Sequence, residues 1–197
     1  MKKPRLVAIP IFMIFLFCSL QATATSVLPV SLQRMAQTAE MIFHGTAIGN
    51  EVRLDPASGR VATYTSFKVI EVIKGNPGAT HTIKQIGGQL PGSNVRLMIH
   101  GVPRFAVGEE YVIFLPKASS LGFASPIGLS QGKFDIRKLN GQAVVANGRA
   151  LAAEMKTAPQ LDLPDTPSAI AADPMPDQPA TLHLADFLQT VRSMVKD

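Results

Sequence analysis

The stretch "YTSFKVIEVIKGNPG", Tyr64–Gly78, decides the fold class of this chain. Its residues alternate as a β-strand requires, because successive side chains of a strand point to opposite faces of the sheet. With the residues just before it, one face takes Val61, Thr63, Thr65, Phe67, Val69, Glu71 and Ile73. "GNPG" then ends the strand with residues suited to a turn. The stretch carries no catalytic motif, so we interpret it as scaffold, a long curled barrel strand with its exit turn.

The opposite face of this strand becomes apolar near its end, at Ile70 and Val72. A strand that is apolar on both faces usually lies in a covered part of a sheet, as happens in curled sheets and small barrels. We therefore expect these two side chains to be covered.

The preceding segments predict a helix and a hairpin. "SLQRMAQTAE" places Leu32, Met35 and Ala36 at helical spacing, with Ser31 as the N-cap. The run from 42 to 48 then alternates like a strand, and "DPASGR" at 55–60 is typical of a turn. The turn joins this strand to the long strand above in the manner of a hairpin.

The following segments predict further short strands. "THTIKQI" reads as a strand, and the almost wholly apolar run Tyr111–Leu115 predicts a central, buried one. Asn140-Gly141 is a strong hairpin signal between the last strands. The predicted fold is therefore mainly β, a small barrel that is closed or partly open, with a short N-terminal helix.

The start of the chain predicts export. A basic head at residues 2–5 precedes an apolar run at 6–20 and then Ala22-Thr23-Ala24, which are the three parts of a secretory signal peptide. A membrane-spanning helix needs roughly 20 apolar residues, more than this run supplies. We predict cleavage after Ala24 and a periplasmic or extracellular location. An uncleaved anchor and lipidation of Cys18 are the alternatives.

The chain is predicted to have four parts: a signal peptide at 1–24, a barrel domain at 25–155, a Pro/Ala/Asp-rich linker at 156–180 and an amphipathic helix at 181–197. The linker is inferred from composition. The last segment is predicted helical because apolar residues recur at helical spacing, at Leu184, Phe187, Leu188 and Val191. This helix either docks on the barrel or serves as a free peptide that binds a partner.

Composition argues against several classes of function. Loss of residues 1–24 lowers the formal charge from +5 to +2, and the remaining Lys and Arg are scattered along the chain. Nucleic-acid binding needs a clustered basic face with stacking aromatics, so we expect no nucleic-acid partner. Cys18 is the only cysteine, which leaves the mature chain without disulfides, thiolate metal ligands or a cysteine nucleophile.

Motifs for catalysis are also missing from the sequence. The four histidines are His44, His81, His100 and His183. They form no HExxH motif and no i, i+4 pair, and neither GxSxG nor a phosphate-binding glycine motif occurs. Glu109 and Glu110 are neighbours on a strand, so they face opposite sides and cannot share a substrate. We expect no catalytic residue, no metal, no cofactor and no enzymatic activity.

The order of three segments, "AEMIFHGTAIG", "TSFKVIEVIKG" and "VGEEYVIFL", resembles the OB-like barrel of the tissue inhibitors of metalloproteinases and the related netrin modules. Over roughly Leu32–Ile136 the chain is more similar to a widespread group of uncharacterised exported bacterial proteins, through Gly87-Gly88, Gly101–Glu110 and Gln131–Phe134. Both resemblances imply an OB-like barrel. The inhibitors chelate the protease zinc through an N-terminal cysteine, which this chain lacks, so only the fold carries over.

These observations predict an exported, non-enzymatic binding or inhibitor-like module, because loops on a rigid scaffold commonly carry recognition. The residues expected to bind a partner are Gly87, Gly88, Asn94, Arg96, His100 and Arg104. The resemblance to the bacterial group implies an exported protein such as a protease as partner, and no membrane span is expected after signal cleavage. The alternative is that the chain is an accessory subunit of an exported metalloprotease-type enzyme, or is itself such an enzyme.

Overall fold

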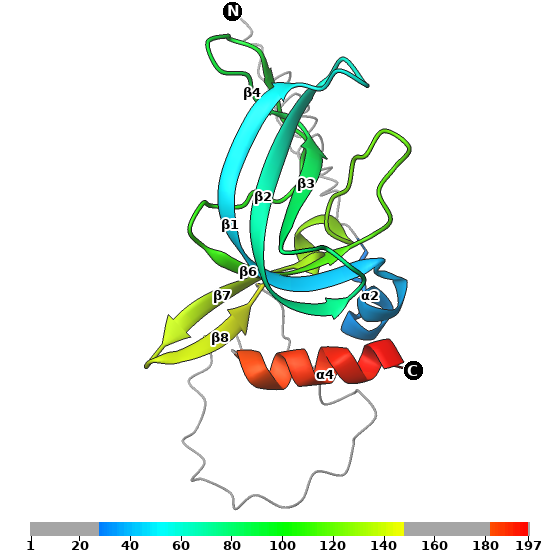
Figure 1. Cartoon of the computed structure of the whole chain (residues 1–197), viewed down its shortest axis with the longest axis vertical. Coiled ribbons are helices and arrows are strands. Elements are labelled where there is room, and N and C mark those ends of the chain that lie inside the picture. Colours follow the sequence, from blue (N-terminus) through cyan, green and yellow to red (C-terminus); the bar gives the residue numbers. More distant parts are fainter. Residues whose placement is uncertain (1–27, 148–181, 197) are drawn as a thin grey trace, which may run out of the picture.

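The computed structural model describes residues 28–147 and 182–196 (Figure 1). The predicted signal peptide and the predicted linker lie outside the described residues. The described part is mainly β, with a seven-stranded antiparallel sheet, a small two-stranded sheet and two α-helices. In this part of the chain, no helix is long and apolar enough to cross a bilayer.

The elements follow one another in the order α2 (Leu32–Thr38), β1 (Met41–Leu54), β2 (Val61–Lys74), β3 (Thr80–Ile86), β4 (Gly88–Gln89), β5 (Arg96–Leu97), β6 (Glu110–Leu115), the 3₁₀ turn η1 (Leu129–Gly132), β7 (Lys133–Leu139), β8 (Gln142–Ala146), β9 (Leu182–His183) and α4 (Leu184–Lys196).

The hairpin of β1 and β2 dominates the sheet. The two strands pair from Ile42↔Lys74 to Leu54↔Val61, and the predicted turn at 55–60 joins them. The predicted inner face of β2 is confirmed in its middle, where Thr65 and Phe67 are buried.

The expectation that Ile70 and Val72 are covered is wrong. Their side chains are 51% and 46% exposed. The reason is that β3 pairs with β2 only from Ala62 to Lys68. The Val69 amide still donates to the Ala79 carbonyl at 3.0 Å. Beyond Val69, β2 forms an edge of the sheet, and its outward side chains have no neighbouring strand in the described residues to cover them.

The main sheet has the strand order β3-β2-β1-β6-β7-β8-β9. Three consecutive strands joined by hairpins, β1 to β3, lie beside a fourth, β6, that returns next to β1, which is the arrangement of a Greek key. β3 and β9 stand at the two ends of this sheet, so the described strands form an open sheet and not a closed barrel.

The strand β6 separates two hydrophobic cores, because both of its faces are covered. Val112 and Phe114 point into a core shared with the two helices. Tyr111 and Ile113 point into a second core, where they meet Phe43, Phe67, Ile83 and Phe105. The predicted central strand is therefore confirmed, since every residue from Tyr111 to Leu115 is buried.

Both helices lie at one end of the molecule, with α4 running alongside the sheet next to α2 (Figure 1). α4 buries the apolar side of its helix against the sheet through Phe187, Leu188, Val191 and Met194. The Phe187 and Phe134 rings lie 4.8 Å apart between centroids. The C-terminal helix is thus docked on the domain.

Two local predictions are confirmed by backbone geometry. Ser31 caps α2, with its Oγ accepting a hydrogen bond of 3.3 Å from the Arg34 amide. Asn140 and Gly141 both have positive φ, 50° and 81°, at the turn between β7 and β8. A two-residue hairpin of this kind needs positive φ at both positions, which is why Asn-Gly favours it.

Candidate functional site

The predicted partner-binding residues begin at a tight backbone junction. Gly87 and Gly88 have φ of 103° and 137°, and a Cβ on Gly88 would lie 2.6 Å from Val52 Cγ1. The Thr63 hydroxyl donates to the Gly87 carbonyl at 2.7 Å, and the Gly87 amide donates to the Val61 carbonyl at 2.8 Å. The glycines therefore have a structural role: they seat the β4–β5 hairpin against the tip of the β1–β2 hairpin.

This small hairpin brings most of the predicted residues together. Gly88 pairs with Leu97 and Gln89 with Arg96, so that Asn94 lies in the connecting turn. The hairpin lies beside the tip of β1 and β2, at the end of the molecule away from the helices (Figure 1).

The last two predicted residues follow the hairpin along the chain. His100 is exposed just after it. Arg104 reaches back, with its Nη2 donating to Met98 Sδ at 4.0 Å. Asn94, Arg96, His100 and Arg104 are therefore all exposed, although Pro103 between them is buried.

The sequence interpretation missed the apolar part of this surface. Val95, Met98 and Ile99 are 52%, 58% and 41% exposed. We call the set Val95, Arg96, Met98, Ile99, His100 and Arg104 the apolar–cationic surface. The chain has no acidic residue between Glu71 and Glu109, so the basic residues of this surface are not balanced by acids near them in sequence.

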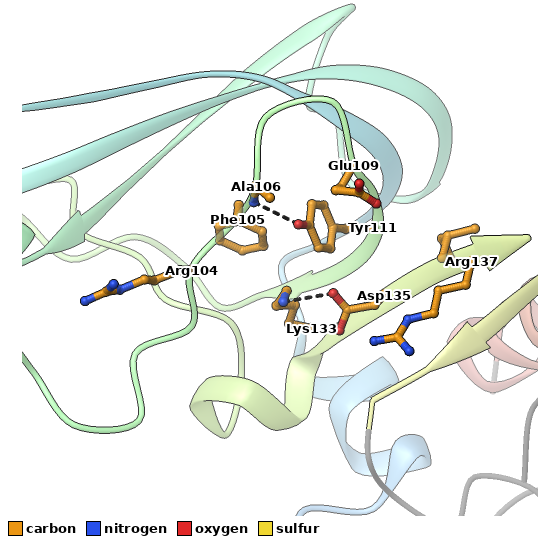
Figure 2. A pocket seen from close by; sticks show the side chains of 9 residues that line it. Arg104, Phe105, Ala106, Glu109, Tyr111, Lys133, Asp135 and Arg137 are labelled. Carbon is orange, nitrogen blue, oxygen red and sulfur yellow. Dashed lines mark hydrogen bonds and ion pairs between the residues drawn. The ribbon is translucent and has the colours of Figure 1, made fainter. Parts of the chain in front are cut away.

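A pocket of about 420 Å³ lies beside Arg104 (Figure 2). Its lining is made by the loop before β6, the start of β6 and the strand β7, and consists of Arg104, Phe105, Ala106, Glu109, Tyr111, Lys133, Asp135, Ile136 and Arg137.

The loop on one side of this pocket is held firmly. Asn50 Nδ2 donates to the Phe105 carbonyl at 2.7 Å, and the Gly108 amide donates to the Ala47 carbonyl at 2.8 Å. The Phe105 ring packs edge-on against Phe67 and Tyr111, with centroids 5.0 and 5.2 Å away. The pocket wall thus rests on the buried core of the sheet and is not a free loop.

The chemistry of the pocket centres on Tyr111 and Lys133. The Tyr111 hydroxyl accepts a hydrogen bond of 2.8 Å from the Ala106 amide, and burial raises the pKa of Tyr111. Lys133 Nζ lies 4.9 Å from the centre of the Tyr111 ring and 2.9 Å from Asp135 Oδ1. Figure 2 shows this ion pair and the Ala106 bond as dashed lines.

The opposite face of β6 carries a different polar pair. His44 is buried, and its Nε2 lies 3.0 Å from Glu110 Oε2. Glu109 lines the pocket of Figure 2, so the prediction that the two adjacent glutamates face opposite sides is confirmed. His44 also lines a groove of about 970 Å³ beside the first turns of α4, where Glu71 forms an ion pair with Arg192.

The pairing of His44 with Glu110 could not be predicted from the sequence, because 66 positions separate the two residues. The other histidines lie apart from this pair. His81 lies against the Phe43 ring, with burial lowering its pKa. Among residues 28–147 and 182–196, no group of three His, Cys, Asp or Glu side chains is placed to hold a metal ion.

The chain matches no known protein-family model, and no curated protein is significantly similar to it. A function for the chain therefore has to be argued from the geometry of these sites.

Proposed function

We propose that this chain is an exported, non-enzymatic binding module whose apolar–cationic surface docks an exported protein with acidic and apolar groups. The observation that carries the proposal is that Val95, Met98 and Ile99 are all exposed on the stretch of chain that also exposes its basic residues, Arg96, His100 and Arg104. Within this stretch, Arg104 contacts Met98. Exposed apolar side chains are stabilised when a partner covers them. Basic side chains at the rim speed association with an acidic surface and fix its orientation.

The scaffold supports this proposal through its topology. The Greek key of β6, β1, β2 and β3 is extended by β7 beside β6, and OB folds are five-stranded, partly open Greek-key barrels. The inner core around Phe43, Phe67 and Ile113 fills the concave side of these strands. We therefore infer an OB-like sheet, on which the β4–β5 hairpin and the following loop present the binding surface.

Export makes other exported proteins the available partners. An inhibitor-like module and an accessory subunit of an exported protease would use the same surface. They differ in one measurable way: binding lowers the activity of the protease in the first case and supports it in the second.

The proposal is tested by site-specific cross-linking in cells. A photo-reactive residue in place of Met98 is expected to give a discrete adduct with one protein. The same residue in place of Leu139, which is 50% exposed but lies on the β7–β8 hairpin, is the matched control and is expected to give none.

A second part of the test reverses the charge of the two arginines of the surface. The double substitution Arg96→Glu with Arg104→Glu is expected to abolish the Met98 adduct, because like charges would face the acidic partner. Lys138→Glu, at an exposed position of β7, should leave the adduct unchanged. An adduct that survives the double reversal, or one that forms equally from position 139, contradicts the proposal.

A further inference from the structure

The pocket of Figure 2 contains hydrogen-bond donors without acceptors. Tyr111 is only 3% exposed, and its hydroxyl already accepts the Ala106 amide. A tyrosine hydroxyl also has one proton to donate, and no group among the described residues accepts it. The Lys133 ammonium has three N–H donors. In the described part of the chain, Asp135 is the one carboxylate that pairs with this ammonium.

The charges around the pocket leave room for an anion. Lys133 and Asp135 balance one another, and the Lys133 side chain is only 17% exposed. Arg137 forms no ion pair with any described residue, and its guanidinium lies at the edge of the pocket near Asp135 (Figure 2). Arg104 points away from the pocket centre (Figure 2), and its guanidinium contacts Met98. Glu109 is exposed, and its negative charge and that of Asp135 both act on the Tyr111 hydroxyl, against the positive charges of Lys133, Arg104 and Arg137 that also line the pocket.

We propose that this pocket binds a carboxylate group, which accepts hydrogen bonds from the Tyr111 hydroxyl and the Lys133 ammonium and is flanked by Arg137. An ionised carboxylate only accepts hydrogen bonds, and its two oxygens can take both donors at once. Phe105 supplies an apolar wall for the carbon chain that bears it. The pocket volume of about 420 Å³ lies in the range of small-ligand sites.

The carboxylate can come from a small organic acid or from a glutamate side chain of a polypeptide. The inference goes beyond the proposed docking of a protein, because the pocket has its own donors and walls.

The experiment is an NMR titration of the full-length chain in two arms. In the first arm, succinate is expected to shift the amides of residues 104–111 and 133–137 in a saturable way, whereas the neutral analogue succinamide does not. In the second arm, a short peptide with one glutamate is compared with the same peptide carrying glutamine. Saturable binding in either arm supports the proposal, and the arm in which it occurs identifies the source of the carboxylate.

Substitutions test whether the Tyr111 hydroxyl and the Lys133 ammonium donate hydrogen bonds to the carboxylate. Tyr111→Phe keeps the ring in its core and is expected to weaken binding about tenfold, which is the usual effect of losing one hydrogen bond to a charged group. Lys133→Met is expected to weaken it at least as much. Tyr64→Phe removes the hydroxyl of the other tyrosine, which bonds to Asp55 and lies outside this pocket, and should leave binding unchanged.

Three results would overturn the proposal. The first is the absence of saturable shifts in both arms. The second is an equal response to succinate and succinamide, or to the glutamate and glutamine peptides. The third is undiminished binding by a Tyr111→Phe chain whose spectrum shows that it is folded.

Discussion

The carboxylate of Asp55 lies almost fully buried at the turn between β1 and β2, where it is only 2% exposed. It accepts hydrogen bonds from the Ser58 amide at 2.9 Å and from the Tyr64 hydroxyl at 2.7 Å, and it forms an ion pair with Lys84 on β3. Lys84 Nζ also donates to the Leu121 carbonyl at 2.7 Å. One carboxylate thus joins the turn, β3 and the loop after β6.

We predict that this cluster makes the protein sensitive to acid. The Lys84 ammonium, with the hydroxyls of Ser58 and Tyr64, holds the pKa of the Asp55 carboxyl well below its ordinary value. A depressed pKa in the folded state stabilises the fold above the unfolded pKa of about 3.9, and this contribution is lost as the pH falls towards the folded value. Asp55→Asn should therefore lower the melting temperature at pH 7 by several degrees and have less effect at pH 3.

Thermal denaturation between pH 7 and pH 2 checks this prediction. Glu51→Gln is the matched control, because Glu51 forms a largely exposed pair with Arg53 and such pairs contribute little. If the curves of melting temperature against pH for Asp55→Asn and the unsubstituted chain run parallel, the proposed acid sensitivity does not come from Asp55.

At the scale of single residues, the sequence predicted local roles and missed distant pairs. Asp55 was correctly placed in a turn, because Asp-Pro followed by Gly is a local signal. Its ion pair with Lys84 could not be predicted, since the register of β3 against β2 decides which lysine reaches it. The same holds for Tyr111 and Lys133, which meet because β6 pairs with β7.

At the scale of the elements, α4 shows what the helical spacing of apolar residues can and cannot predict. The apolar spacing predicted a helix with one apolar face, and Phe187, Leu188 and Val191 of that face are buried. Periodicity shows that a face is apolar but not what covers it. Here the rings of Phe114 and Phe134 and the side chains of α2 cover it.

We predict that this docking stabilises the domain. Phe187 is fully buried, so Phe187→Ala should lower the free energy of unfolding by about 3–5 kcal/mol, because it removes a buried ring and leaves a cavity. Gln189→Ala, on the exposed side of α4, is the matched control and should change it by less than about 0.5 kcal/mol. Denaturant unfolding followed by circular dichroism measures both. Equal midpoints for the two variants would mean that the helix is not docked in solution.

At the scale of the whole molecule, the alternation of apolar and polar residues defines some parts of the architecture and not others. It predicted the long strands β1 and β2, the buried middle of β2 and the central strand β6, and hence the mainly β class. It did not predict β9, which lies in the segment 181–197 that was predicted to be helical. Whether the first and last strands of a sheet meet depends on twist and on loop paths, which leave no pattern in the residues. The closed barrel was therefore one of two expectations, and the described strands form an open sheet.

At the scale of the whole chain, we predict that the protein is exported and that the mature protein begins at Thr25. Cells expressing the chain with a C-terminal tag should yield it in the periplasmic fraction or the medium, and N-terminal sequencing should read Thr-Ser-Val. Replacing Ala22 and Ala24 with bulky residues should block cleavage, because the signal peptidase requires small side chains there. Recovery of the native chain with its original N-terminus would exclude a cleaved signal.

The outer edge of β2 beyond Val69 affects the behaviour of the protein at high concentration. Its backbone donors and acceptors face away from β1 without a pairing strand in the described part of the chain, next to the exposed side chains of Ile70 and Val72. Such an edge is a template on which a second extended polypeptide can add. At the end of the strand, the Lys74 ammonium donates to carbonyls of α2 and so ties this edge to the helix. Between Val69 and Lys74, crowding would favour edge-to-edge stacking of one molecule on another.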